Sequence, residues 1–223
     1  QVNMDEILCG NGAAELFFAA VQAVWPQKAL VIAPSFSEYE EALRSVGAEV
    51  EYYYLCEEDN FQIRGDYVDK LSEEIDMIFL CNPNNPTGQT IDRDMLIKIL
   101  DRCKKQNIVV ILDECFLEFL DEPNRYEMSD LRGEYPNLLI IKAFTKIFSM
   151  PGLRLGYAIS SNQDILEEMS WKLQQWNVSV PAQMAGVAAL EKPKEYIRQT
   201  REYVSGQREY MRNIMKMMGY VVF

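Results

Sequence analysis

Three groups of polar residues stand directly after apolar, strand-like segments of this sequence. Residues 82–88 read Asn-Pro-Asn-Asn-Pro-Thr-Gly after the segment 76–81, Asp113 follows the segment 108–112, and Lys146 follows the segment 138–143. Ligands of an open parallel sheet bind beyond the carboxyl ends of its strands. We therefore expect these groups to line one site, where a lysine and a carboxylate could carry acid–base or covalent chemistry.

A fourth signal is a turn of small residues that opens a predicted helix. Residues 10–15 read Gly-Asn-Gly-Ala-Ala-Glu. The first backbone N–H groups of a helix have no partner within it, and together with the helix dipole they favour a bound phosphate. This turn is therefore predicted to bind an anionic group.

The composition excludes several classes of function. The 223 residues contain no histidine, which removes Ser-His-Asp and Cys-His catalysis and the usual zinc sites, so no metal is predicted. The net charge of −12 argues against a nucleic-acid partner. No apolar run is long enough to cross a bilayer. The five cysteines form no Cys-x-x-Cys pair, which indicates reduced thiols in a cytoplasmic protein.

The chemistry-bearing residues need a scaffold, and the alternation of segment types predicts one. Short apolar strands between helices are typical of a parallel sheet that is covered on both faces. We therefore predict an α/β fold with three layers and a mainly parallel sheet. Strands are expected at residues 28–33, 49–55, 76–81, 108–112, 138–143, 153–160 and 220–223, and helices at residues 13–24, 38–46, 67–74, 92–106 and 194–218.

Longer motifs resemble those of a known family. The segments NPNNPTG, LDECFLEF and KAFTKIFSMPGLRLGY are similar to those of the class I/II aminotransferase superfamily, which uses pyridoxal 5′-phosphate (PLP). The similarity extends from Gly10 to about Pro181. Within the superfamily, PSFSEYEEAL, Thr145 before the lysine and Phe116 most resemble threonine-phosphate decarboxylases, and histidinol-phosphate aminotransferases come next.

The resemblance implies roles for the residues that contact the cofactor ring. Lys146 is expected to bind PLP covalently and then to act as general base and acid, as a buried amine with a lowered pKa. Asp113 is expected to pair with the pyridine nitrogen and Asn85 to hydrogen-bond the ring oxygen O3′. Phe36 is expected to stack on the ring, although a phenylalanine is more often part of a core.

The phosphate of the cofactor should have its own set of residues. The resemblance implies that Arg154 clamps it with its guanidinium group. Ala13 and Ala14 should offer backbone N–H groups, although alanines also simply favour a helix. Thr145 could add a hydroxyl, and ordinary packing at a strand end is an almost equal alternative.

The sequence also departs from the family pattern. Many relatives have a tyrosine that bonds O3′ at the position of Phe116, so O3′ would depend on Asn85 alone. We expect residues 1–193 to form the PLP-binding large domain, and residues 194–223 to form a long linking helix and the start of a C-terminal small domain. That small domain, which supplies an arginine for the substrate carboxylate, is expected to be largely absent.

Several functions remain open from the sequence. The main expectation is a PLP-dependent enzyme of the class I/II family acting on an amino acid or a phosphorylated amino acid or amine, with a threonine-phosphate decarboxylase-like reaction favoured. The alternatives are a histidinol-phosphate-type aminotransferase and the PLP-sensing domain of a transcription regulator. A purely structural homologue is disfavoured by the intact residue set. The resemblance also implies a homodimer.

Overall fold

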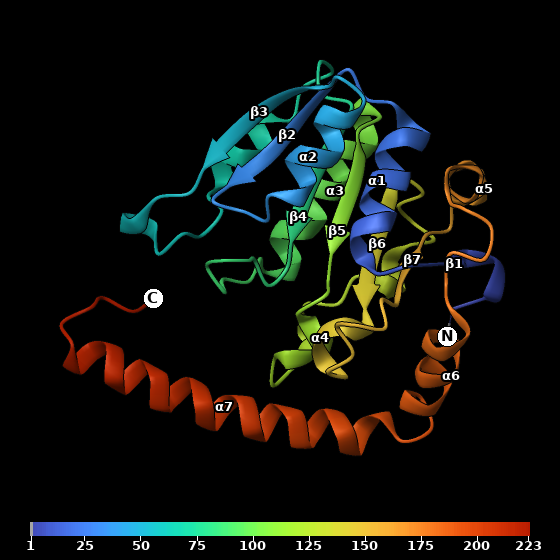
Figure 1. Cartoon of the computed structure of the whole chain (residues 1–223). Coiled ribbons are helices and arrows are strands. Elements are labelled where there is room, and N and C mark those ends of the chain that lie inside the picture. The colour runs from blue at the N-terminus through green and yellow to red at the C-terminus, as the bar shows by residue number, and fades with distance from the viewer. Residues whose placement is uncertain (1) are drawn as a thin grey trace.

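The computed structural model describes residues 2–223, which are built around one seven-stranded sheet (Figure 1). The strand order is β1-β7-β6-β5-β4-β2-β3. All neighbours from β6 to β3 run parallel, whereas β7 is antiparallel to both β6 and β1. The strands are β1 (Ile7–Gly10), β2 (Lys28–Ala33), β3 (Glu49–Tyr54), β4 (Met77–Cys81), β5 (Val109–Asp113), β6 (Leu138–Ala143) and β7 (Gly156–Ile159).

Helices cover both faces of this sheet, which confirms the predicted three-layer α/β fold. On one face, a buried apolar cluster joins the sheet to α1, α2 and α5. On the other face, a second cluster joins it to α3 and to a 3-10 helix. The α-helices are α1 (Ala13–Val24), α2 (Glu38–Ser45), α3 (Arg93–Gln106), α4 (Phe144–Ile147), α5 (Gln163–Lys172), α6 (Val180–Ala189) and α7 (Pro193–Met217).

Burial explains why the central strands are apolar throughout. Every residue of β4 and of β6 is buried, because helices lie above and below them. Lys142 is the one charged residue in these two strands, and it is paired with three glutamates, among them Glu114. The sheet core therefore leaves polar side chains mainly at the strand ends.

Residues with special backbone requirements set the helix boundaries. Helix α1 ends at Trp25, which adopts a left-handed conformation before Pro26, a residue without an amide hydrogen. Helix α3 begins after Asp92 and ends at Asn107, which is left-handed and donates its N–H to the carbonyl of Cys103. Asparagine tolerates this conformation better than most residues.

Two predicted elements were wrong and one strand was not predicted. The helix expected at 67–74 is a 3-10 helix, Gly65–Lys70, because the chain turns after Lys70 to reach β4 at Met77. The segment 220–223 forms no strand, since no strand of residues 2–223 lies beside it to accept its backbone hydrogen bonds. The four residues of β1 are too few to show a pattern.

Helix α7 lies along the outside of the domain (Figure 1). It has 25 residues, and none of them is buried. Its hydrogen bonds to the body come from Tyr196, Thr200 and Arg201, which bind the carbonyls of residues 148, 147 and 118. Gly219 follows the helix end with a φ of 84°, the left-handed conformation that commonly terminates a helix. No helix in the described part of the chain combines the length and apolar character needed to cross a membrane.

Candidate functional site

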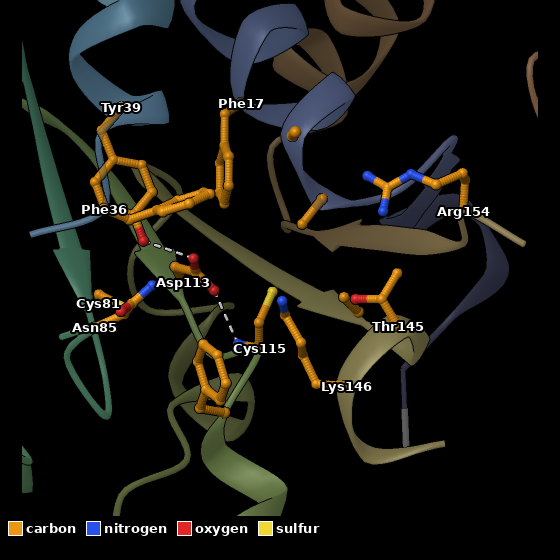
Figure 2. A pocket seen from close by; sticks show the side chains of 14 residues that line it. Phe17, Phe36, Tyr39, Cys81, Asn85, Asp113, Cys115, Thr145, Lys146 and Arg154 are labelled. Atoms are coloured by element: carbon orange, nitrogen blue, oxygen red, sulfur yellow. Dashed lines mark hydrogen bonds between the residues drawn. The ribbon is translucent and has the colours of Figure 1, made fainter. Parts of the chain in front are cut away.

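A cavity of about 160 Å³ opens at the carboxyl ends of the central strands (Figure 2). All the residues that the sequence singled out for a cofactor lie in its wall. The complete lining is Ala13, Ala14, Phe17, Phe36, Tyr39, Cys81, Asn85, Asp113, Cys115, Phe116, Ala143, Thr145, Lys146 and Arg154. Segments far apart in the sequence therefore meet at one place.

The register of the sheet explains why the polar signals converge. Cys81, at the end of β4, lies opposite Asp113, at the end of β5. Asp113 in turn lies opposite Ile141, two residues before β6 ends at Ala143. Helix α4, which carries Thr145 and Lys146, begins at once after Ala143. The residues that follow these three neighbouring strands therefore lie at the same edge of the sheet.

The three asparagines of the loop after β4 have different tasks. The buried amide of Asn82 pairs with both backbone groups of Ile91. The Asn84 amide donates to the carbonyl of Pro34 and to the hydroxyl of Thr87. Asn85 lies in the cavity wall, and its side chain hydrogen-bonds no other residue among 2–223. Asn82 and Asn84 therefore fix the loop, and Asn85 presents an unused amide to the cavity.

Asp113 forms the polar floor of the cavity. Only 4% of this residue is exposed. One carboxylate oxygen accepts a hydrogen bond of 2.6 Å from the hydroxyl of Tyr39, and the other accepts one of 2.8 Å from the backbone N–H of Cys115. Burial raises the pKa of Asp113 above its ordinary value, while the Cys115 thiol, these two donors and the charge of Lys146 act in the opposite direction.

Lys146 projects into the cavity from α4, close to Cys115 (Figure 2). Its Nζ lies 5.5 Å from the centre of the Phe116 ring. The residue is exposed, so the expectation of a buried amine was wrong for this chain. The reason is geometric, because α4 is a single turn at the open edge of the sheet and nothing in residues 2–223 covers this side of the cavity.

The opposite end of the cavity is built from a glycine turn and an arginine. Gly12 precedes α1 with φ 89° and ψ 165°, and no side chain caps the helix. A Cβ atom on Gly12 would stand 2.5 Å from a guanidinium nitrogen of Arg154. A Cβ on Gly156 would stand 2.7 Å from the backbone nitrogen of Ala13. Both glycines therefore allow a close approach that any side chain would prevent.

This arrangement concentrates positive potential at one point. The first N–H groups of α1, including those of Ala13 and Ala14, lack partners within the helix. Arg154 donates to the carbonyl of Pro151 and forms no ion pair with any carboxylate of residues 2–223. A guanidinium without an ion pair, beside a helix N-terminus without a side-chain cap, is suited to a phosphate dianion.

The residues present fit PLP in the chemistry of their donors. A phosphate fits the end formed by Gly12 and Arg154, a pyridine nitrogen fits the buried carboxylate of Asp113, and an aldehyde fits the amine of Lys146. Phe36 supplies an aromatic wall. Within residues 2–223 no group of three or more cysteine, aspartate or glutamate side chains is arranged to hold a metal ion.

Sequence reasoning missed five residues of the wall, namely Phe17, Tyr39, Cys81, Cys115 and Ala143. Cys81 and Cys115 stand beside predicted functional residues, so strand alternation could have suggested them. Tyr39 lies within the quoted motif PSFSEYEEAL, three residues after Phe36. Its contact with Asp113 joins residues that are far apart in sequence, and no local signal indicates such a contact.

The fold and this residue set define a class of protein. The family model described as aminotransferase class I and II matches residues 1–223, and the chain belongs to this family.

Particular relatives come from two branches. The chain is 36% identical over 191 residues to a threonine-phosphate decarboxylase of Salmonella typhimurium, covering 86% of this chain and 52% of that protein. It is 37% identical to a histidinol-phosphate aminotransferase of Desulfitobacterium hafniense, covering 90% and 55%. The crystal structure of the histidinol-phosphate aminotransferase from Clostridium acetobutylicum superposes with a TM-score of 0.87 at 30% identity, covering 97% and 63%. The chain thus spans between half and two thirds of these relatives.

Proposed function

We propose that this chain forms the cofactor-binding part of a PLP-dependent enzyme that acts on an amino acid or a phosphorylated amino acid or amine. The observation that carries the proposal is the single cavity in which Lys146, Asp113 and the Gly12–Arg154 end lie together. When bound, PLP withdraws electrons from the carbon next to the substrate nitrogen. Residues 1–193 would be the large domain and residues 194–223 the link to a small domain.

Each residue has a role that follows from its position. Lys146 would hold the cofactor and move protons at its Nζ. Asp113, ionised and buried, would keep a proton on the ring nitrogen, and Asn85 would orient the ring through its free amide. Phe36 would cover one ring face. Arg154, Ala13, Ala14 and Thr145 would bind the phosphate.

For the reaction, we favour a decarboxylation like that of threonine-phosphate decarboxylases. The support is the 36% identity to the Salmonella protein and the presence of Phe116, which cannot donate to the ring oxygen as a tyrosine would. Transamination of the histidinol-phosphate type is the second candidate, supported by the 37% identity to the Desulfitobacterium protein. The relative rates with threonine phosphate and histidinol phosphate would separate the two.

A homodimer is also part of the proposal, since membership of the family implies one. Sedimentation of the purified protein at several concentrations tests it. A PLP-sensing regulator would instead bind DNA, and a gel-shift assay with genomic fragments would reveal that.

The central experiment is the visible absorption spectrum of the protein with added PLP. We expect a band of lysine-bound cofactor that is lost in Lys146→Ala and retained in Lys172→Ala, which removes an exposed lysine of α5. Cofactor binding with no visible band, or a band that survives Lys146→Ala, would contradict the role of Lys146. Complete lack of binding would favour a purely structural homologue.

A further inference from the structure

Tyr39 is a buried residue that the proposed function does not yet use. It lies in the first turn of α2 and is fully buried. Its ring stacks on Phe79 at 4.9 Å and meets Phe17 edge-on at 5.1 Å. A phenylalanine would serve this packing equally well, so the packing does not explain the hydroxyl.

The hydroxyl of Tyr39 faces the thiol of Cys81 and the carboxylate of Asp113, and the carboxylate is the charged partner. The Tyr39 hydroxyl donates to the carboxylate over 2.6 Å, and the side chains point toward one another in Figure 2. The titratable side chains that face Asp113 are those of Tyr39, Cys81, Cys115 and Lys146. Among them, the Tyr39 hydroxyl and the Cys115 thiol are side-chain donors to Asp113, and the hydroxyl forms the short bond of 2.6 Å.

We propose that Tyr39 is a positioning residue that acts through Asp113, and that its hydroxyl holds the carboxylate ionised and oriented so that the proton shared with the cofactor's ring nitrogen lies on the nitrogen. This inference rests on the proposed function. It assigns Tyr39 no contact with the substrate.

The physical reason is the selective stabilisation of one charge state. A hydroxyl that donates to a carboxylate stabilises the anion, and it opposes the burial that favours the neutral acid. Without the hydroxyl, Asp113 would keep the N–H and the thiol of Cys115 as donors but would bind a proton more tightly. A hydrogen bond to a charged group is strong enough to change proton affinity by roughly tenfold or more.

The first measurement uses the cofactor-free protein. The side-chain carboxyl carbon of Asp113 is titrated by carbon-13 NMR in wild type and in Tyr39→Phe. We expect its proton affinity to rise at least roughly tenfold in the variant. The matched control is Tyr53→Phe, because Tyr53 is also a buried tyrosine that donates to an aspartate, Asp66, over 2.6 Å. That control should leave the Asp113 titration unchanged.

The second measurement uses PLP labelled with nitrogen-15 in its ring. The ring-nitrogen shift reports where the proton lies, and we expect it to move toward the unprotonated position in Tyr39→Phe but not in Tyr53→Phe. If Tyr39→Phe leaves both titration and shift as in wild type, the inference is wrong while the cofactor assignment stands. If wild type binds PLP with no proton on the ring nitrogen, the role of Asp113 fails and the inference fails with it.

Discussion

Replacing Gly12 by alanine tests the phosphate end of the cavity most directly. Gly12 has φ 89° and ψ 165°, a conformation that is almost restricted to glycine and costs other residues about 1–3 kcal/mol. The new Cβ would also stand 2.5 Å from a guanidinium nitrogen of Arg154. The guanidinium must therefore move away from the N-terminus of α1.

The cost to binding can be separated from the cost to folding. A hydrogen bond to a charged group contributes about 1.5–3 kcal/mol, so a displaced Arg154 should weaken PLP binding by roughly 10- to 150-fold. Gly47→Ala is the matched control. Gly47 also has a positive φ, 78°, but an added Cβ there meets no atom within 4 Å. It should lose stability by about 1–2 kcal/mol and keep its affinity for PLP.

The assay combines PLP titration with chemical denaturation of both variants. Gly12→Ala should lose stability and affinity together, while Gly47→Ala should lose stability alone. If Gly12→Ala binds PLP as tightly as Gly47→Ala, Arg154 does not hold the phosphate from its present position, and the assignment of this end of the cavity is wrong.

Two further predictions concern Glu114 and Phe116, which follow β5 in the chain. Burial raises the pKa of Glu114 from 4.5 to about 7, although Lys142 lies 3.2 Å away. The folded protein then holds a proton that the unfolded chain loses between these pH values, so stability should fall as pH rises through this window. Glu114→Gln should remove this decline, which is worth at most about 3 kcal/mol. Urea unfolding at pH 5 and pH 8 measures it. A variant whose unfolding free energy still falls as in wild type between these pH values would contradict the prediction. Phe116→Tyr should add a donor near the ring oxygen and lower, roughly tenfold, the proton affinity of lysine-bound PLP. A spectrophotometric pH titration would show this, and an unmoved midpoint would mean that the new hydroxyl does not reach the ring.

The central strands and their following residues were predictable because each depends on local pattern. Buried parallel strands are apolar along their whole length, and the polar residues after β4, β5 and β6 stand out by contrast. The motif around Lys146 and Arg154 led, through family resemblance, to the prediction that this site binds PLP. Helix α1 was predicted with its observed bounds because glycine precedes it and Trp25-Pro26 follows.

The features that were missed depend on contacts between distant segments. β1 is a strand because it pairs with β7, and residues 220–223 form no strand because nothing pairs with them. The exposure of Lys146 depends on which segments cover the cavity. The residues next to Lys146 in the sequence carry no signal of that. The bond between Tyr39 and Asp113 likewise requires the three-dimensional placement of α2 above the end of β5.

The pairing of β1 with β7 also has a consequence for folding kinetics. Gly10 lies opposite Gly156 in this pair, and Gly12 lies beside Arg154, so this end of the cavity forms where the first and last strands of the chain order meet. Contacts of such high sequence separation raise the contact order and slow folding, since a long loop must close before they form. During synthesis, the cavity stays incomplete until the segment around Arg154 has been made. A ligand that binds only the completed sheet stabilises the folded state by mass action. PLP would therefore stabilise the pairing of β1 with β7.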